Sequence, residues 1–176
     1  MKPANLLSLL LLVIILFDGY GQELKRNTLY LEAGGAAFYY SINYDKVYPV
    51  GLKGGIALRA GFMYVNTFNN VARRMYGIPV GISYLYMLKR NFLEFGLTGA
   101  GILDRYYSGS RAFDPVIEDR VIIQSVKFGI RHQPTTKRLF WNAAVQYSFL
   151  FIGDQRSPIQ ASHSLPLVSL GLGYSF

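Results

Sequence analysis

Ser162, His163 and Ser164 are the residues whose types could support covalent catalysis, and Asp154 precedes them in the same polar segment. A serine nucleophile, a histidine base and a carboxylate form the triad of many hydrolases. A loop, however, rarely holds a nucleophile and its base in the geometry that catalysis needs. We therefore predict that this segment is a polar loop and that the protein is not an enzyme.

Metal, redox and nucleotide chemistry are not expected either. The chain has no cysteine, which excludes disulfides and thiolate ligands. His132 has no further metal-ligating residues beside it, and a metal site needs several ligands. The segment Gly99-Ala100-Gly101 is not a nucleotide-binding loop and is better explained by crowding in a strand. No cofactor is therefore predicted.

Six charged residues are spaced so that they fall on one face of several apolar segments. An unpaired charge in a narrow protein interior is costly, so charges gathered there must form ion pairs. We interpret them as a salt-bridged plug. The alternative is a set of pairs that exchange partners and gate a narrow path. The six residues are Glu32, Lys53, Arg59, Glu94, Lys127 and Arg131.

The elements that would carry these charges are strands, because apolar and polar residues alternate with a period of two. The segment 52–65 is the clearest example, with Leu58 and Phe62 on one face and Arg59 on the other. The alternating segments are 28–34, 38–47, 52–65, 78–88, 93–100, 125–131, 140–151 and 165–176.

The connections between these segments alternate in length. Those after the second, fourth and sixth segments are short, whereas 66–75, 104–120 and 153–164 are longer and polar. Outer-membrane barrels show this asymmetry between periplasmic turns and external loops. The first external connection is an exception, because Gly34 and Gly35 indicate a tight reversal. The predicted fold is an all-β, antiparallel up-and-down transmembrane β-barrel of about eight strands.

Residues 1–21 are predicted to be a signal peptide. Lys2 precedes an apolar run, 6–17, that is too short to span a bilayer, which needs about 20 residues. Cleavage is expected near Gly21, leaving one barrel domain at 22–176. The chain combines 14 Tyr, 12 Phe and 18 Gly with only 16% charged residues, which indicates β-structure in lipid.

The final strand carries Ser169, Gly171, Tyr174 and Phe176, the last residue of the chain. This pattern resembles the closing-strand signal that the barrel assembly machinery recognises in outer-membrane barrels. With the alternation and the loop asymmetry, the mature chain resembles the small barrels of the OmpA-transmembrane and OmpX type, and uncharacterised Gram-negative barrels of that fold. The resemblance implies a location in the outer membrane and contact with the assembly machinery.

Outward-facing aromatic residues lie toward the ends of the predicted strands, where amphipathic rings settle at the lipid headgroups. The alternative explanation is that aromatic residues favour strands in general. They are Tyr44, Tyr64, Tyr84, Tyr86, Trp141 and Tyr147.

An eight-stranded barrel is just wide enough to be filled by its own side chains, so we expect no open pore. One alternative is passive passage of a small apolar ligand through a narrow barrel, as in the OmpW type. Inward-facing Met63, Val65, Leu85 and Met87 would supply an apolar patch for it. A second alternative is a soluble ligand-binding barrel, whose apolar faces would have to turn inward.

The predicted long loops are rich in arginine, and the chain has a formal net charge of +8. The abundant anions outside an outer membrane are the phosphates and carboxylates of lipopolysaccharide, which suit the planar guanidinium. The alternative is a solvated basic surface with no specific partner. Nucleic acid is not expected, because no motif for it is present. The possible lipopolysaccharide contacts are Arg73, Arg74, Arg105, Arg111, Arg120 and Arg156. The expected role is envelope integrity or surface interaction.

Overall fold

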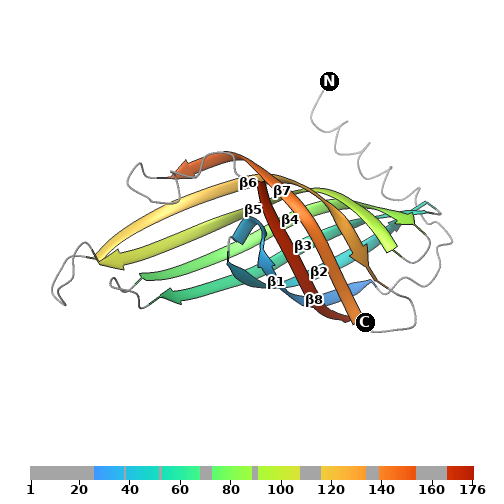
Figure 1. Ribbon diagram of the computed structural model, residues 1–176, viewed down its shortest axis with the longest axis horizontal. Coiled ribbons are helices and arrows are strands. Elements are labelled where there is room, and N and C mark those ends of the chain that lie inside the picture. Colours follow the sequence, from blue (N-terminus) through green and yellow to red (C-terminus); the bar gives the residue numbers. More distant parts are fainter. Residues whose placement is uncertain are drawn as a thin grey trace, which may run out of the picture.

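The chain folds into a closed barrel in which each strand pairs antiparallel with its neighbours in sequence (Figure 1). The computed structural model describes residues 26–37, 39–51, 53–67, 73–88, 91–107, 116–133, 139–153 and 166–176. The strands are β1 Asn27–Gly34, β2 Tyr40–Val50, β3 Gly54–Thr67, β4 Arg73–Leu88, β5 Asn91–Tyr107, β6 Val116–His132, β7 Leu139–Gly153 and β8 Pro166–Ser175; a 3-10 turn, η1, spans Gly35–Ala37. The predicted eight-stranded, all-β barrel is confirmed.

The barrel closes between the first and the last strand. β1 pairs with both β2 and β8, and the register runs from Thr28 opposite Ser175 to Gly34 opposite Ser169. Two backbone bonds extend this ladder, from Asn27 N to Phe176 O at 3.1 Å and from Phe176 N to Asn27 O at 2.9 Å. The sheet therefore has no free edge, which is the condition for a strand structure in lipid. We call the end of the barrel that carries Asn27 and Phe176 the terminal end. The opposite end, where β1 ends at Gly34, is called the far end.

The two faces of the wall have the polarity that the alternation predicts. Leu170 and Leu172 are 58% and 61% exposed on the outside, whereas Ser169 and Ser175 are fully buried inside. The other outward positions are likewise rich in exposed Leu, Ile, Val, Phe and Tyr. An inward-turned apolar face, which the soluble-barrel alternative requires, is thus contradicted. No helix among the described residues is long and apolar enough to cross a membrane.

The strands on one side of the barrel are longer than those on the other side (Figure 1). β4, β5 and β6 have 16, 17 and 17 residues, whereas β1 has 8. The predictions that 66–75 and 104–120 are loops are therefore wrong at their ends, since these residues extend β3 to β6. We call the band of exposed apolar side chains on the outer face the apolar belt. Beyond this belt both faces of a strand carry polar side chains, so the alternation that reveals a strand disappears there.

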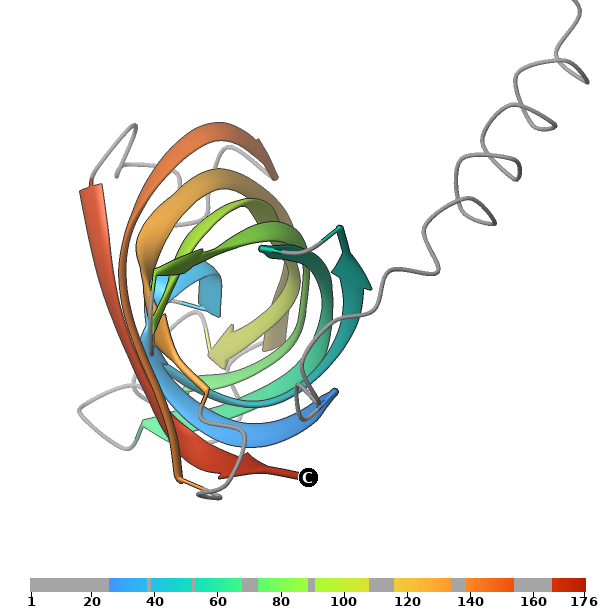
Figure 2. The ribbon, with the colours of Figure 1, turned by 90° about the vertical axis from the view of Figure 1, so that its right-hand side faces the viewer.

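The connection between β1 and β2 turns into the barrel. Gly34 and Gly35 have φ of 77° and 70°, a conformation that glycine adopts without strain. The bond from Gly34 N to Tyr39 O, at 2.6 Å, closes the connection. Figure 2 shows η1 inside the ring of strands, where Ala36 is 4% exposed. The predicted tight reversal is thus a short connection whose η1 turn lies inside the barrel.

The register of β6 and β7 shifts between Gln124 and Ser125. Gln124 pairs with Leu150 and Ser125 pairs with Ser148, which leaves Phe149 as the extra residue of a bulge. After the bulge the pairing continues with Phe151 opposite Ile123, so the regular alternation that the sequence predicts for 140–151 is interrupted at Phe149. Alternation alone does not reveal such an insertion, because it assumes one residue opposite one residue.

Candidate functional site

Arg59 on β3 is the centre of an ion network inside the barrel. Its Nη1 donates to Glu32 Oε2 at 2.8 Å, and its Nε donates to Asp45 Oδ1 at 3.3 Å. Its Nη2 lies 3.8 Å from Glu94 Oε1. One guanidinium thus connects carboxylates from β1, β2 and β5, which ties non-adjacent parts of the wall together.

Two further cations complete the network. Lys127 Nζ donates to Glu94 Oε1 at 3.0 Å, and Arg131 Nη1 donates to Asp45 Oδ2 at 2.6 Å. Three carboxylates and three cations therefore balance within the protein. All six side chains are buried, and we call them the interior cluster: Glu32, Asp45, Arg59, Glu94, Lys127 and Arg131.

Aromatic rings lie between the two arginines of the interior cluster. Tyr30 and Phe140 have ring centroids 4.8 Å apart. Arg59 lies 5.2 Å from the Tyr30 ring and Arg131 lies 4.7 Å from the Phe140 ring. The Tyr30 hydroxyl donates to Asp45 Oδ1 at 3.1 Å. Cation–π contacts of this kind stabilise guanidinium groups that have lost water.

Five of the six charged residues that the sequence pattern selects lie in this cluster. Lys53 does not, because it is exposed in the turn between β2 and β3, so its predicted inward position is wrong. Asp45 takes part although it was not among the six, and it bridges both arginines. Asp45 lies on the inward face of the predicted second strand, so the alternation could have identified it as a member of the cluster.

Two apolar clusters lie on either side of the interior cluster. Along β3 the inward order is Ala57, Arg59, Met63, so the charge separates the apolar side chains. The cluster toward the far end contains Ala36, Met63, Val65, Met75, Ala100, Ile102, Val121 and Ile123. The cluster toward the terminal end contains Val47, Ala57, Leu85 and Phe92, with Met87 packed against it. Met63 and Val65 therefore do not form one apolar path with Leu85 and Met87.

Arg73 faces the interior at the far end. Its Nε donates to Asp104 Oδ1 at 2.8 Å, and its Nη2 also donates to this carboxylate. Asp104 is fully buried and lies opposite Asp119 in the register of β5 and β6. Arg73 is thus part of the interior packing rather than of an outward surface.

Arg74, Arg105 and Arg120 face outward on β4, β5 and β6. Arg74 lies directly opposite Arg105, and Arg105 lies opposite Glu118. Arg105 Nη2 is 2.9 Å from Glu118 Oε2, and Arg120 Nη2 is 3.6 Å from Glu118 Oε1. We call these four residues the arginine strip. Glu118 pairs with Arg105 and Arg120, and with Arg74 the strip has three cations and one carboxylate, a net charge of +2. Arg111 and Arg156 lie outside the described residues.

The six predicted interface aromatics are all partly exposed on the outward face. Tyr64 also packs against Tyr76, with ring centroids 5.2 Å apart. Tyr76 is two residues from Arg74 on the same face of β4, so an aromatic pair lies next to the arginine strip. The exposed fractions of the six lie between 37% and 49%, and the residues are Tyr44, Tyr64, Tyr84, Tyr86, Trp141 and Tyr147.

The closing strand uses its small residues for interior packing. Ser169 Oγ accepts from Gln146 Nε2 at 3.2 Å. A Cβ on Gly171 would lie 2.2 Å from Asn142 Oδ1, so glycine is needed for this close approach. Tyr174 and Phe176 are exposed outside with ring centroids 6.3 Å apart. The role of these four residues as an assembly signal stays a prediction.

The residues considered for catalysis or metal binding give no assembled centre in the described part of the chain. Asp154, Ser162, His163 and Ser164 lie outside the described residues. His132 Nδ1 is 2.7 Å from Asn91 Oδ1, and its ring stacks on Trp141. Among the described residues no three His, Cys, Asp or Glu side chains gather as metal ligands.

Solved structures with a similar backbone place this architecture among known barrels. Ail, the attachment invasion locus protein of Yersinia pestis, is 11% identical, with a TM-score of 0.53 over 86% of this chain and 99% of that chain. The chain has the fold of a small eight-stranded outer-membrane barrel. The predicted resemblance to barrels of this kind is thus confirmed for the fold.

Further comparisons add no finer assignment. A second Ail structure, in complex with the heparin analogue sucrose octasulfate, is 13% identical, with a TM-score of 0.54 over 85% of this chain and 95% of that chain. CarO of Acinetobacter baumannii is 9% identical, with a TM-score of 0.39 over 87% and 98% of the two chains. No protein-family model and no curated protein sequence matches the chain.

Proposed function

We propose that this protein is a non-catalytic, integral outer-membrane barrel that stabilises the outer leaflet by binding the anionic headgroups of lipopolysaccharide at the arginine strip. The observation that carries this proposal is the outward charge of Arg74, Arg105 and Arg120, which Glu118 balances only in part. In this reading residues 1–21 direct export and are removed near Gly21, and the closing strand recruits the barrel assembly machinery.

The apolar belt supports insertion in a membrane. Its exposed side chains cover the outside of the wall in the described residues, far more than a soluble monomer exposes. Tyr64 and Tyr76 then mark the boundary toward the far end, because tyrosine rings settle at the headgroup level. The arginine strip begins immediately beyond this pair, at the depth of lipid phosphates.

The interior supports a structural role rather than transport. The interior cluster balances its own charge, and the apolar clusters and η1 fill the space toward either end. A solute would have to displace ion pairs that are shielded from water. The function is therefore assigned to the outer surface.

Guanidinium groups suit this task, because each presents a planar fork that binds two phosphate oxygens. Arg74 and Arg105 are neighbours across β4 and β5, and like charges side by side repel each other without an anion between them. A phosphate at this position removes the repulsion. One heparin-analogue complex of Ail shows a barrel of this fold with a polyanion, and it supports the same class of ligand here.

The test is a lipopolysaccharide titration of the purified barrel in neutral detergent. A folded barrel and the heat-unfolded chain migrate differently on a gel, and the measured quantity is the temperature at which this heat-dependent gel shift occurs. At a concentration of about 100 times Kd, binding stabilises the wild type by about 2.7 kcal/mol. Arg74→Gln/Arg105→Gln/Arg120→Gln should abolish this gain. The control is Arg26→Gln/Lys53→Gln, which removes exposed cations at the terminal end and should keep the gain. Equal losses in both variants would contradict a role specific to the arginine strip.

A further inference from the structure

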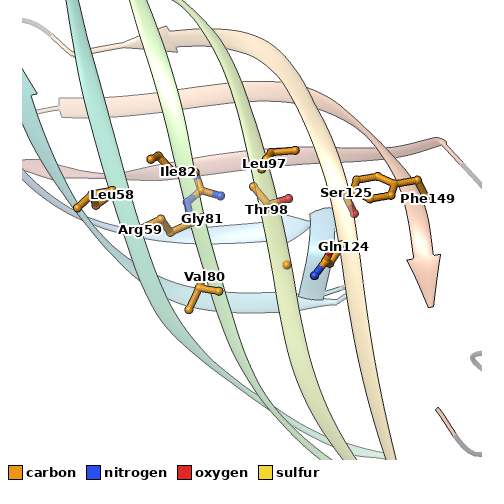
Figure 3. A pocket seen from close by; sticks show the side chains of 11 residues that line it. Leu58, Arg59, Val80, Gly81, Ile82, Leu97, Thr98, Gln124, Ser125 and Phe149 are labelled. Atoms are coloured by element: carbon orange, nitrogen blue, oxygen red, sulfur yellow. The ribbon is translucent and has the colours of Figure 1, made fainter. Parts of the chain in front are cut away.

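A depression of about 520 Å³ lies in the wall, from Leu58 on β3 to Phe149 on β7 (Figure 3). It opens on the outer face, because the side chains of Leu58, Val80, Ile82 and Leu97 that line it are 44–53% exposed. We call it the wall groove. It is lined by Leu58, Arg59, Val80, Gly81, Ile82, Leu97, Thr98, Gly99, Gln124, Ser125 and Phe149.

Glycines on the outward face of β5 account for the missing volume. Gly99 lies opposite Val80 on one side and opposite Gln124 on the other. Gly101 follows at the next outward position toward the arginine strip, and a Cβ there would have no atom within 4 Å. The neighbouring outward positions are Leu97 and Leu103. Gly101 thus leaves open space next to the groove on its far-end side, between Ile78 and Ile122 on the neighbouring strands.

Gln124 is the polar group of this groove. It is exposed on the outward face of β6, beside the bulge that the extra residue Phe149 creates. Its outward neighbours along β6, between Arg120 and His132, are Ile122, Val126, Phe128 and Ile130. A primary amide surrounded by apolar side chains and hydrocarbon needs a hydrogen-bond partner. The amide therefore favours an occupant that carries oxygen at this depth.

The depth of Gln124 matches an acyl chain whose headgroup is at the arginine strip. Gln124 is four residues from Arg120 on the same face, about 14 Å along the strand at about 3.4 Å per residue. With a strand tilt of about 45° this is about 10 Å of depth, within the roughly 15 Å of hydrocarbon that one leaflet contributes. The positive charge directly above the groove then selects an anionic lipid.

We propose that the wall groove binds one acyl chain of an anionic lipid whose phosphate is at the arginine strip, and that Gln124 hydrogen-bonds to an oxygen on this chain, a hydroxyl or an ester. This inference rests on the proposed function, since it names which part of the lipid the barrel recognises besides its phosphate. Gln124 is then a specificity residue that separates oxygen-bearing acyl chains from plain ones, and Gly99 and Gly101 provide the space for the chain.

The experiment compares two probes by native mass spectrometry of the purified barrel: lipid A, with hydroxylated and ester-branched chains, and phosphatidylglycerol, with plain chains. Wild type should retain lipid A more strongly. Gln124→Leu should reduce this preference by about tenfold, as expected for the loss of one well-placed hydrogen bond. Gly101→Leu should weaken both lipids by filling the open space beside the groove, and Ala33→Leu, which places a leucine on the outside of β1, should leave both unchanged. A preserved heat-dependent gel shift shows that each variant is folded.

The outcomes separate the two proposals. If the triple arginine variant loses lipid A but Gln124→Leu and Gly101→Leu bind as wild type, the headgroup site stands and the acyl-chain inference is wrong. If wild type retains neither lipid, the proposed function fails as well. If the wild type is a dimer and Gln124→Leu is a monomer with the same lipid preference, the groove is an interface between two copies and the inference is overturned.

Discussion

The interior cluster and the arginine strip both combine basic residues with carboxylates, but the interior cluster is electrically neutral and the strip has a net positive charge. Inside the barrel Arg59, Arg131 and Lys127 face three carboxylates, so the protein neutralises its own charge. On the outside, the three arginines of the strip share one carboxylate among the described residues, Glu118, which contacts Arg105 and Arg120. Charge that is cut off from water must be compensated by the fold, whereas charge at a headgroup region can take its counter-ion from the membrane.

This difference assigns separate roles to the two regions. Removing a partner in the interior cluster should cost stability and leave headgroup binding at the arginine strip unchanged. Removing a partner in the arginine strip should change lipid binding and leave stability unchanged. Each substitution below tests one side of that contrast.

Arg59→Ala should give the largest loss of stability. It removes the guanidinium that holds Glu32, Asp45 and Glu94, and so leaves a net negative charge inside the wall. Breaking a buried ion network in this way costs about 3–5 kcal/mol. The measurement is the free energy of unfolding from urea titration of the barrel in lipid vesicles, with Arg59→Lys as the charge-preserving control.

The same variant should create no conductance in planar bilayers, because η1 and both apolar clusters still fill the interior. Large single-channel currents in the wild type would contradict the interpretation of the interior cluster as a salt-bridged plug, and would favour ion pairs that exchange partners. An unfolding free energy equal to that of the wild type would show instead that the network does not contribute to stability.

Gly35→Ala should give the next largest effect. Its φ is positive, and a Cβ would lie 2.6 Å from Glu32 Oε1 and 2.7 Å from Gln146 Nε2. Backbone strain and overpacking together should cost about 2–3 kcal/mol. Gly51→Ala is the matched control, because Gly51 also has positive φ but nothing lies within 4 Å of its Cβ. It should lose only about 1 kcal/mol. Equal losses in the two variants would argue against close packing of η1 inside the barrel.

The barrel was predictable from the sequence because lipid contact imposes a strict period of two on the apolar belt. Residues such as Leu170 and Leu172 face outward while Ser169 faces inward, and this pattern needs no partner to be recognised. The far-end extensions were missed, because Arg74 and Arg105 lie where both faces of the strand are polar. The bulge at Phe149 was missed because an inserted residue depends on what the partner strand requires.

The interior cluster was predictable in composition but not in its contacts. Inward position selected Glu32, Arg59, Glu94, Lys127 and Arg131, yet the sequence contains no measure of which carboxylate each cation reaches. Asp45 bridges Arg59 and Arg131 across the barrel, from strands that are far apart in sequence. The wall groove was not predictable at all, because it depends on the register that brings Gly99 opposite both Val80 and Gln124.

Glu118→Gln should have the smallest effect on stability and yet a measurable effect on binding. The substitution raises the net charge of the arginine strip from +2 to +3 and releases Arg105 and Arg120 from their carboxylate. An exposed ion pair contributes little to folding, so the unfolding curve should match the wild type. Lipopolysaccharide affinity should rise by about two- to fivefold, and the gain should shrink at high salt because exposed charges are screened.

The matched substitution inside the barrel is Glu94→Gln, which leaves Lys127 Nζ without its carboxylate at 3.0 Å. It should lower the free energy of unfolding and leave lipopolysaccharide affinity as in the wild type. The same loss of one negative charge thus gives opposite readouts in the two regions. If Glu118→Gln destabilised the barrel as much as Glu94→Gln, the strip would be part of the fold's own charge balance, and its role in binding lipid would lose its physical basis.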